Sequence, residues 1–311
     1  MNALQARDLC SIDDYTPAEV DLVLAAAGAL KRHPERASHV AAHKTLAMIF
    51  EKPSLRTRVT FEVAMTQMGG HAIYLQPSDI QLGKREPVKD VARNLSRWCD
   101  AIMARTFSHQ TILDLADNAS IPVINGLSDR EHPCQALADF LTIIEHKGDC
   151  SALKLTYLGD GNNVAHSLLL LAAKLGMQCS VACPSGYEPA PDIVQCAREI
   201  GVETGTEITI GADPYAMIAG ADVVYTDVWT SMGQEEERAE RLRIFPPYQL
   251  NAALLAAAKP DAMVLHCLPA HRGEEITEEV LEGPQSAVLD QAENRLHAQR
   301  AVLALAFGWT L

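Results

Sequence analysis

The sequence has few aromatic residues, no excess of positive charge and no closely paired cysteines. Phe, Trp and Tyr make up only 5% of the 311 residues, although 48% are hydrophobic, so the core must consist mainly of Ala, Leu, Val and Ile. A formal net charge of −14 disfavours nucleic acid and anionic membranes as partners, because both require a basic surface. Any bound anion must therefore be held by a local cluster of positive side chains.

The eight cysteines are scattered and form no C-x-x-C pair, which favours small buried residues over a disulfide framework or a metal site. The N-terminal segment MNALQARDLCSIDDY lacks the apolar region of a secretion signal, and no apolar run is long enough to span a bilayer. We therefore expect a cytoplasmic protein with reduced thiols, and we assign it no metal and no cofactor.

Short apolar runs alternate with longer helical patterns along the whole chain, which predicts an α/β fold with parallel sheets. The expected domain boundary lies near residues 148–152. Helices are predicted at 53–70, 88–99, 110–119, 132–148 and 293–307. Strands are predicted at 44–50, 71–75, 100–105, 121–126, 153–159, 179–184, 221–227 and 262–269.

The segment EKPSLRTR (51–58) places positive charge at the start of a helix. Ser54 is the expected N-cap, so Arg56 and Thr57 fall in the first turn, where acidic side chains are normally preferred. A second arginine follows at Arg58. Backbone N–H groups, hydroxyls and a guanidinium together suit a phosphate, so the pattern indicates an anion site. The alternative is a surface helix with solvated arginines.

Polar residues also gather where strands end, which in open parallel sheets is where ligands bind. Arg105 closes one strand, and His132 and Gln135 flank Pro133 at the start of a helix. The simpler readings are a surface arginine and a capping histidine. Three later strands end in GDGNN (159–163), TDVW (226–229) and HCLP (266–269).

Of two nucleotide-binding motifs, one is absent and the other is incomplete, and one further segment is highly charged. No G-x-x-x-x-G-K-[ST] loop occurs, which disfavours nucleoside triphosphate hydrolysis. In GDGNN the third glycine of a dinucleotide fingerprint is replaced by Val164, and no acidic ribose ligand follows at the expected distance, so a dehydrogenase is disfavoured. The charge run 233–243 is typical of a solvated helical face.

The motifs SLRTR, HPCQALADF, TDVWTSMGQE and HCLPAHRGEE occur in one order along the chain. Together they resemble the aspartate/ornithine carbamoyltransferase family, on its ornithine branch. The resemblance implies two doubly wound parallel-sheet α/β domains with the active site in the cleft between them. It implies a carbamoyl phosphate-binding domain at 1–148, an ornithine-binding domain at 149–290, and a C-terminal helix at 291–311 that packs on the first domain. It also implies a homotrimer or a multiple of trimers.

The resemblance further implies roles for individual residues. Arg105, His132, Gln135 and Cys267 would act in catalysis. Carbamoyl phosphate would be bound by those four together with Ser54, Leu55 (through its backbone), Arg56, Thr57, Leu268, Arg295 and, from a neighbouring subunit, Gln81. Ornithine would be bound by Asn163, Asp227, Ser231 and Met232, with Asp227 on its α-ammonium group.

The implied reaction transfers the carbamoyl group to the δ-amine of L-ornithine and gives L-citrulline and phosphate, a step of arginine metabolism. The alternatives are transfer to an N-acylated ornithine or a diamine, or a family relative without catalytic activity. A diamine would leave Asp227 without its α-ammonium partner. A non-catalytic relative would be expected to lose Arg56, Arg105 or His132, and all three are present.

Overall fold

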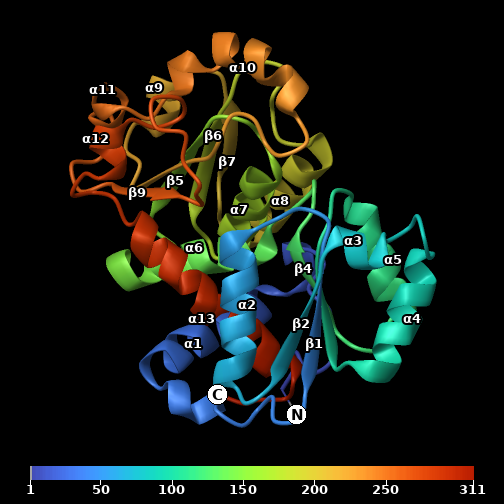
Figure 1. Cartoon of the computed structure of the whole chain (residues 1–311). Helices are drawn as coiled ribbons and strands as arrows, with labels where there is room; N and C mark the ends of the chain where they lie inside the picture. The colour runs from blue at the N-terminus through green and yellow to red at the C-terminus, as the bar shows by residue number, and fades with distance from the viewer. Residues whose placement is uncertain (1) are drawn as a thin grey trace. The chain divides into compact units, whose positions relative to one another are not determined.

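The computed structural model describes residues 2–311 and divides by compactness into two units (Figure 1). One unit comprises residues up to 141 together with 293–311, and the other comprises 142–292. Each is built around its own parallel sheet, so the predicted class of two parallel-sheet α/β domains is confirmed. The two divisions between the units fall inside helices α6 (Pro133–Lys147) and α13 (Val288–Ala306).

The first unit has a four-stranded sheet in the order β2-β1-β3-β4. All its ladders are parallel. Helices lie on both faces, with α4 and α5 on one side and α2 on the other (Figure 1). The strands are β1 (Thr45–Phe50), β2 (His71–Leu75), β3 (Ala101–Arg105) and β4 (Val123–Leu127), and the helices are α1 (Pro17–Arg32), α2 (Leu55–Gln67), α3 (Pro77–Ile80), α4 (Val88–Trp98) and α5 (His109–Asn118).

Alternate side chains of the central strands enter two different cores, as the period of two in a strand requires. Ala47, Ile49 and Ile102 pack with Val91 and Leu95 of α4 in one cluster. The intervening residues of β1, including Met48 and Phe50, are also almost fully buried. A strand buried on both faces reads as a continuous apolar run, which explains why the sequence located these strands well.

The second unit has a five-stranded sheet in the order β7-β6-β5-β8-β9, again with parallel ladders throughout. Helices α7 and α8 pack together beside β6 and β7, whereas α9 packs on β5 and β6 with α11 behind it. The strands are β5 (Lys154–Leu158), β6 (Gln178–Ala182), β7 (Ile208–Gly211), β8 (Val223–Thr226) and β9 (Met263–His266), and the helices are α7 (Asn163–Lys174), α8 (Pro191–Thr204), α9 (Pro214–Ile218), α10 (Arg238–Ile244), α11 (Ala252–Leu255) and α12 (Glu278–Leu281).

Helix α1 and strand β7 are among the elements that were not predicted from the sequence. Helix α1 begins with a capping box in which Thr16 and Glu19 exchange hydrogen bonds, and it buries alanines and leucines. Strand β7 is a four-residue edge strand whose residues after Ile208 are only half-buried. Between residues 2 and 311 the structure has no helix long and apolar enough to cross a membrane.

Candidate active site

Each sheet reverses its strand order beside a central strand, and this fixes where a ligand can bind. The chain passes from β1 to β2 on one side and then to β3 on the other; it passes likewise from β5 to β6 and later to β8. At such a point the loops after neighbouring strands leave in opposite directions and open a crevice. A ligand site is therefore expected at the carboxyl ends of β1 and β3 and at those of β5 and β8.

The loop after β1 enters α2 through the predicted cap. The Ser54 hydroxyl accepts a hydrogen bond from the Thr57 N–H at 3.2 Å, and the first turn has no acidic residue. Leu55 is 75% exposed, and because its side chain is apolar, any hydrogen bond that Leu55 donates to a bound anion comes from its backbone N–H. The remaining N–H groups of this turn and the helix dipole favour an anion.

Arg58 has a different use from its neighbour Arg56. Its Nε atom donates to Glu62 Oε1 at 2.9 Å, and its guanidinium carbon lies 3.9 Å from the ring centroid of Tyr74. Both contacts occupy Arg58 on the protein surface. An anion at this helix would therefore be bound by Arg56 and not by both arginines.

Arg105 is the last residue of β3, and the backbone around it is irregular. Ala104 pairs with Asn125 in β4 whereas Arg105 pairs with Leu127, so Gly126 is an extra residue in β4. A Cβ atom on Gly126 would lie 2.5 Å from the Met103 sulfur, which explains a glycine at this position. Such bulges redirect neighbouring side chains and are common beside active sites. Arg105 is only 5% exposed, so it is not the surface arginine of the simpler reading.

A buried network joins the start of α2 to α6 and α13. Arg295 Nη2 donates to Thr57 Oγ1 at 3.1 Å, and Nη1 of the same guanidinium donates to Gln135 Oε1 at 2.5 Å. The amide of Gln135 in turn donates to Asp139 Oδ1 at 2.7 Å. Because the Thr57 oxygen accepts from Arg295, its hydroxyl proton can point away towards a ligand.

His132, just before α6, is buried among positive charges. Burial lowers its pKa well below the usual value, and the neighbouring Arg295, Arg105 and Arg56 lower it further. The imidazole is therefore neutral at physiological pH, with one N–H to donate. A neutral donor can polarise a carbonyl oxygen without adding to the repulsion among the three arginines.

Gln81 lies apart from this group, in the segment 76–87 beyond β2. Its side chain is exposed and its backbone is left-handed, with φ of 44°. The carbonyl of Gln81 accepts hydrogen bonds from the N–H groups of Lys84 and Arg85, which fold the segment into a tight turn.

In the second unit the carboxyl ends of β5 and β8 bring two polar side chains together. Asn162 precedes α7, and its Oδ1 atom accepts the N–H groups of Val164 at 2.9 Å and Ala165 at 3.2 Å. Its Nδ2 atom donates to Asp227 Oδ2 at 2.9 Å. The sequence pointed to the next residue, Asn163, which is the first residue of α7 and is half-buried.

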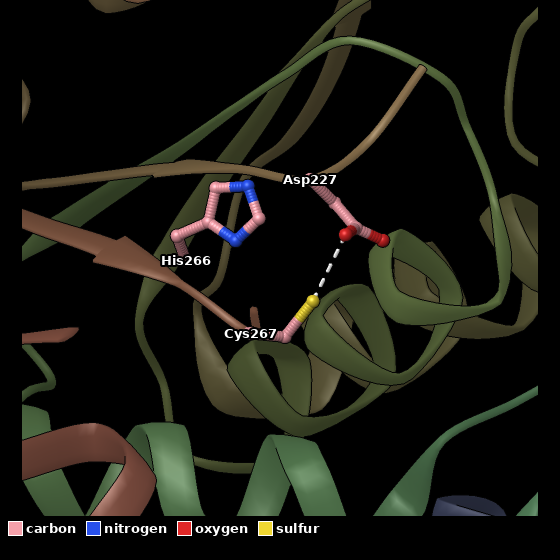
Figure 2. Close-up of side chains that lie close together, drawn as sticks. All are labelled: Asp227, His266 and Cys267. Atoms are coloured by element: carbon pink, nitrogen blue, oxygen red, sulfur yellow. Dashed lines mark hydrogen bonds between the residues drawn. The ribbon is translucent and has the colours of Figure 1, made fainter. Parts of the chain in front are cut away.

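The second oxygen of Asp227 faces Cys267 (Figure 2). Cys267 Sγ lies 2.9 Å from Asp227 Oδ1, which also accepts the Val228 N–H at 2.8 Å. Asp227 is 6% exposed. This carboxylate accepts from an amide, a backbone N–H and a thiol, which are all neutral groups. The negative charge is therefore stabilised but not balanced by a cation among these contacts.

The segment after β9 is held in an uncommon backbone conformation. Leu268 has φ of 58° and is followed by a cis bond to Pro269, and its N–H donates to His266 Nδ1 at 2.8 Å. His266 Nδ1 is thus an acceptor, which assigns the proton to Nε2 and directs it to Glu275 Oε1 at 3.1 Å. Together these bonds fix the backbone that carries Cys267 and Leu268.

The segment after β8 contains the other two predicted ornithine contacts. Ser231 is half-buried, and its N–H donates to Gln234 Oε1 at 3.2 Å, whereas the Met232 side chain is 45% exposed. The charge run that follows is not simply a solvated face, because Arg241 is 4% exposed. Arg241 donates to the Trp229 carbonyl at 2.7 Å and pairs with Asp160 at 3.0 Å, so it anchors this segment to the end of β5.

Burial raises the pKa of Asp160 to about 6, although the Arg241 guanidinium opposes the shift. The carboxyl group is therefore ionised at pH 7 and the ion pair with Arg241 is formed, whereas mild acid weakens it.

Comparison with known proteins assigns both units to one family. Residues 7–145 match the family model described as aspartate/ornithine carbamoyltransferase, carbamoyl-P binding domain, and residues 151–306 match the Asp/Orn binding domain of the same family. The chain belongs to the aspartate/ornithine carbamoyltransferase family. The resemblance seen in the four sequence motifs is thereby confirmed.

Relatives within this carbamoyltransferase family match almost the whole chain. An ornithine carbamoyltransferase of Anoxybacillus flavithermus is 55% identical over 302 residues, covering 96% of each chain. One of Pyrococcus furiosus, described as anabolic, is 53% identical and covers 98% of each chain. The solved structure of ornithine carbamoyltransferase from Pyrococcus furiosus superimposes with a TM-score of 0.96 at 52% identity and full coverage of both chains.

The structure of this carbamoyltransferase also accounts for the glycines that suggest a dinucleotide site. A Cβ atom on Gly161 would lie 2.2 Å from the backbone nitrogen of Pro189, and the Gly161 N–H donates to the Tyr187 carbonyl at 2.9 Å. The close approach that requires a glycine is thus made by the protein's own chain. Gly159, with φ of 126°, meets the need for an unusual backbone at the end of β5.

One group of side chains at the carboxyl ends of β8 and β9 could hold a metal ion by the type of its ligand atoms. Asp227, His266 and Cys267 each offer a ligand atom, and these atoms lie within 4.8 Å of one another. Both ring nitrogens of His266 are engaged, however, by the Leu268 N–H and by Glu275. A metal here would have to break the bonds that fix the backbone after β9, so the donor set suits a hydrogen-bonded cluster better than a metal centre.

The low pKa of His132 predicts how stability depends on pH in this family member. Below pH 6.5 His132 binds a proton in the unfolded chain but stays neutral in the folded chain. The free energy of unfolding therefore falls as the pH drops below 6.5, by up to about 1.4 kcal/mol per pH unit. We expect the difference in the free energy of unfolding between wild type and His132→Gln to shrink by about 1 kcal/mol from pH 6.5 to 5.5 in urea unfolding, less than the limiting slope because the unfolded histidine is already half protonated at pH 6.5. The same substitution at exposed His39 is the control, and equal pH slopes for wild type and His132→Gln would contradict the prediction.

Proposed function

We propose that this protein transfers the carbamoyl group of carbamoyl phosphate to the δ-amine of L-ornithine, giving L-citrulline and phosphate. The observation that carries the proposal is the opposite charge of the two half-sites. The first unit gathers Arg56, Arg105 and Arg295 around a neutral histidine, and the second presents Asp227 with neutral donors only. An anionic carbamoyl donor and a cationic amino acid fit this division.

In the carbamoyl phosphate half-site, the phosphate group is assigned to the start of α2. The N–H groups of the first turn, including that of Leu55, and the side chains of Ser54, Arg56 and Thr57 supply its ligands. Cys267 and Leu268 are assigned to the same substrate by the resemblance alone.

The carbonyl oxygen is assigned to Arg105, His132 and the Thr57 hydroxyl. Gln135, held by Arg295 and Asp139, would contact the carbamoyl group by accepting an N–H of its NH2 group on Oε1, which has a second lone pair beside the one that accepts from Arg295. Positive charge and N–H donors aimed at this oxygen stabilise the negative charge that develops on it in the tetrahedral intermediate.

The acceptor amine must be neutral before it attacks, whereas a free alkyl ammonium has a pKa of about 10.4. Asp227 would hold the α-ammonium, and Asn163, Ser231 and Met232 would surround the rest of the amino acid. Cys267, which lies 2.9 Å from Asp227, would orient the δ-nitrogen. As the carbonyl carbon bonds to nitrogen, the bond to phosphate breaks, and the departing phosphate can accept the amine proton. No protein base is therefore required.

The charge of the second half-site also favours ornithine over aspartate. Aspartate carries a second carboxylate, which requires a cation, and Arg241 is already committed to Asp160 and Glu237. An N-acylated ornithine lacks the α-ammonium charge that Asp227 would hold. A diamine such as putrescine keeps an ammonium at the same distance from the reacting amine and lacks the carboxylate, so the missing carboxylate, and not loss of the partner of Asp227 as the sequence suggested, distinguishes it from ornithine. The Pyrococcus furiosus relative is described as anabolic, and we propose the same direction here, in arginine biosynthesis.

Citrulline formation tests the proposed function directly. We expect rapid turnover of carbamoyl phosphate with L-ornithine and little with N-acetylornithine, putrescine or L-aspartate. Turnover with another acceptor alone would preserve the carbamoyl phosphate half-site and contradict the ornithine half-site. No turnover with any of the four would favour a non-catalytic relative.

The different uses of Arg56 and Arg58 provide a matched pair of variants. Arg56→Ala should weaken carbamoyl phosphate binding by roughly 1.5–3 kcal/mol, the usual contribution of a charged hydrogen bond, and raise the Michaelis constant for that substrate. Arg58→Ala removes an equal charge two residues away and should change that constant little, because Arg58 is engaged with Glu62 and Tyr74. Equal effects of the two variants would show that net charge, and not the helix terminus, binds the phosphate.

We further propose a cytoplasmic homotrimer, or a multiple of it, in which Gln81 reaches carbamoyl phosphate in a neighbouring subunit. The exposed turn of Gln81, separate from the network around Arg295, supports this assignment. The cysteines Cys10, Cys134, Cys179 and Cys183, buried as thiols, suit a reducing compartment. Sedimentation equilibrium should give three times the mass of the chain or a multiple of that; a monomer would contradict the assignment of Gln81.

A further inference from the structure

Asn162 connects three elements of the second unit through a single amide. Its Oδ1 atom accepts the N–H groups of Val164 and Ala165 in the first turn of α7 and lies 3.3 Å from the Tyr157 hydroxyl of β5. All three partners are donors, so this atom must be the oxygen and the amide cannot be reversed. The NH2 group is thereby directed at Asp227 Oδ2, 2.9 Å away.

The Tyr157 side of this arrangement is rigid. Tyr157 is fully buried, its ring stacks on that of Tyr225 with centroids 5.8 Å apart, and the Tyr225 hydroxyl accepts from Gln291. Burial and the nearby Asp227 raise the pKa of Tyr157 well above its usual value, so its hydroxyl remains a donor. The Asn162 side chain is thus held by the Tyr157 hydroxyl and by the N-terminal N–H groups of α7.

We infer that Asn162 is a positioning residue for the acceptor amino acid, which sets the orientation of the Asp227 carboxylate through a neutral hydrogen bond. The inference rests on the proposed function, because it adds a residue to the ornithine half-site. With Oδ2 held by Asn162 and Oδ1 by Val228 and Cys267, the carboxylate plane cannot rotate. The donor has to be an amide, because a cation here would neutralise the charge that the substrate ammonium needs.

Two substitutions at Asn162 separate its link to Asp227 from its role as a helix cap. Serine is also a good N-cap, so Asn162→Ser keeps an acceptor for α7 and removes only the donor to Asp227. Aspartate is an equally good cap, but Asn162→Asp places a second carboxylate against Asp227. The matched control is Asn251→Ser, because Asn251 caps α11 by accepting the Leu254 N–H at 3.0 Å and has no carboxylate partner.

Steady-state kinetics of citrulline formation is the first measurement. We expect Asn162→Ser to raise the Michaelis constant for ornithine about tenfold or more, as for a lost hydrogen bond to a charged group, with the constant for carbamoyl phosphate unchanged. Asn251→Ser should leave both constants at the wild-type values. If the two serine variants behave alike, or if both substrates are affected equally at Asn162, the inference is wrong.

The pH dependence of Asn162→Asp is a readout that a purely structural role would not change. Two carboxylates in contact share a proton below the higher pKa of the pair, and the helix terminus favours charge on residue 162, so Asp227 is the group that holds the proton. The ratio of the variant's ornithine constant to that of wild type should therefore fall as the pH rises and the proton leaves. A ratio that does not change with pH would overturn the inference.

A binding measurement separates failure of this inference from failure of the proposed function. L-Norvaline has the α-ammonium and carboxylate of ornithine but no δ-amine, and its binding in the presence of carbamoyl phosphate can be measured by calorimetry. Wild-type protein that neither forms citrulline nor binds norvaline would contradict the proposed function. An active wild type with an unchanged norvaline affinity in Asn162→Ser would contradict only the role of Asn162.

Discussion

Parallel strand pairing is the constraint on which the rest of this structure depends. Because every ladder in both sheets is parallel, all carboxyl ends of a sheet meet at one edge, and each crossover helix begins there with unpaired N–H groups. The two half-sites use these helix starts differently. At α2 we propose an anionic ligand for the N–H groups, whereas at α7 the Asn162 side chain accepts the N–H groups of Val164 and Ala165 and donates to Asp227.

The two units gather charge of opposite sign. Three arginines are concentrated around His132, and burial keeps that histidine from becoming a fourth cation. In the second unit the deeply buried Arg241 pairs with Asp160 and anchors the backbone, so it does not serve as a cation for Asp227. Bringing charges of one sign together costs stability, and under the proposed function a bound substrate of the opposite charge would recover that cost.

Sequence reasoning located the buried strands and the ends that carry function, because strands covered on both faces read as continuous apolar runs and polar residues mark where they stop. The Ser54 cap was predictable from residue type and position. The sequence did not predict the Asn162 cap, because which of two adjacent amides caps a helix depends on one residue of backbone register. It also missed the buried state of Arg241, since its aromatic and acidic partners, Tyr187, Phe245 and Asp160, are distant or unremarkable in sequence.

The chain passes from one compact unit to the other inside helices α6 and α13, and this limits how such proteins can be recombined. A chimaera that exchanged acceptor preference by joining two homologues at residue 148 would keep α6 whole. Its second junction, however, would have to lie outside α13. This helix begins in the unit that contains Asp227, and its residue Arg295 belongs to the other unit. Exchange of substrate preference by gene fusion therefore requires a junction before Val288, so that Arg295 comes from the same parent as the rest of its helix.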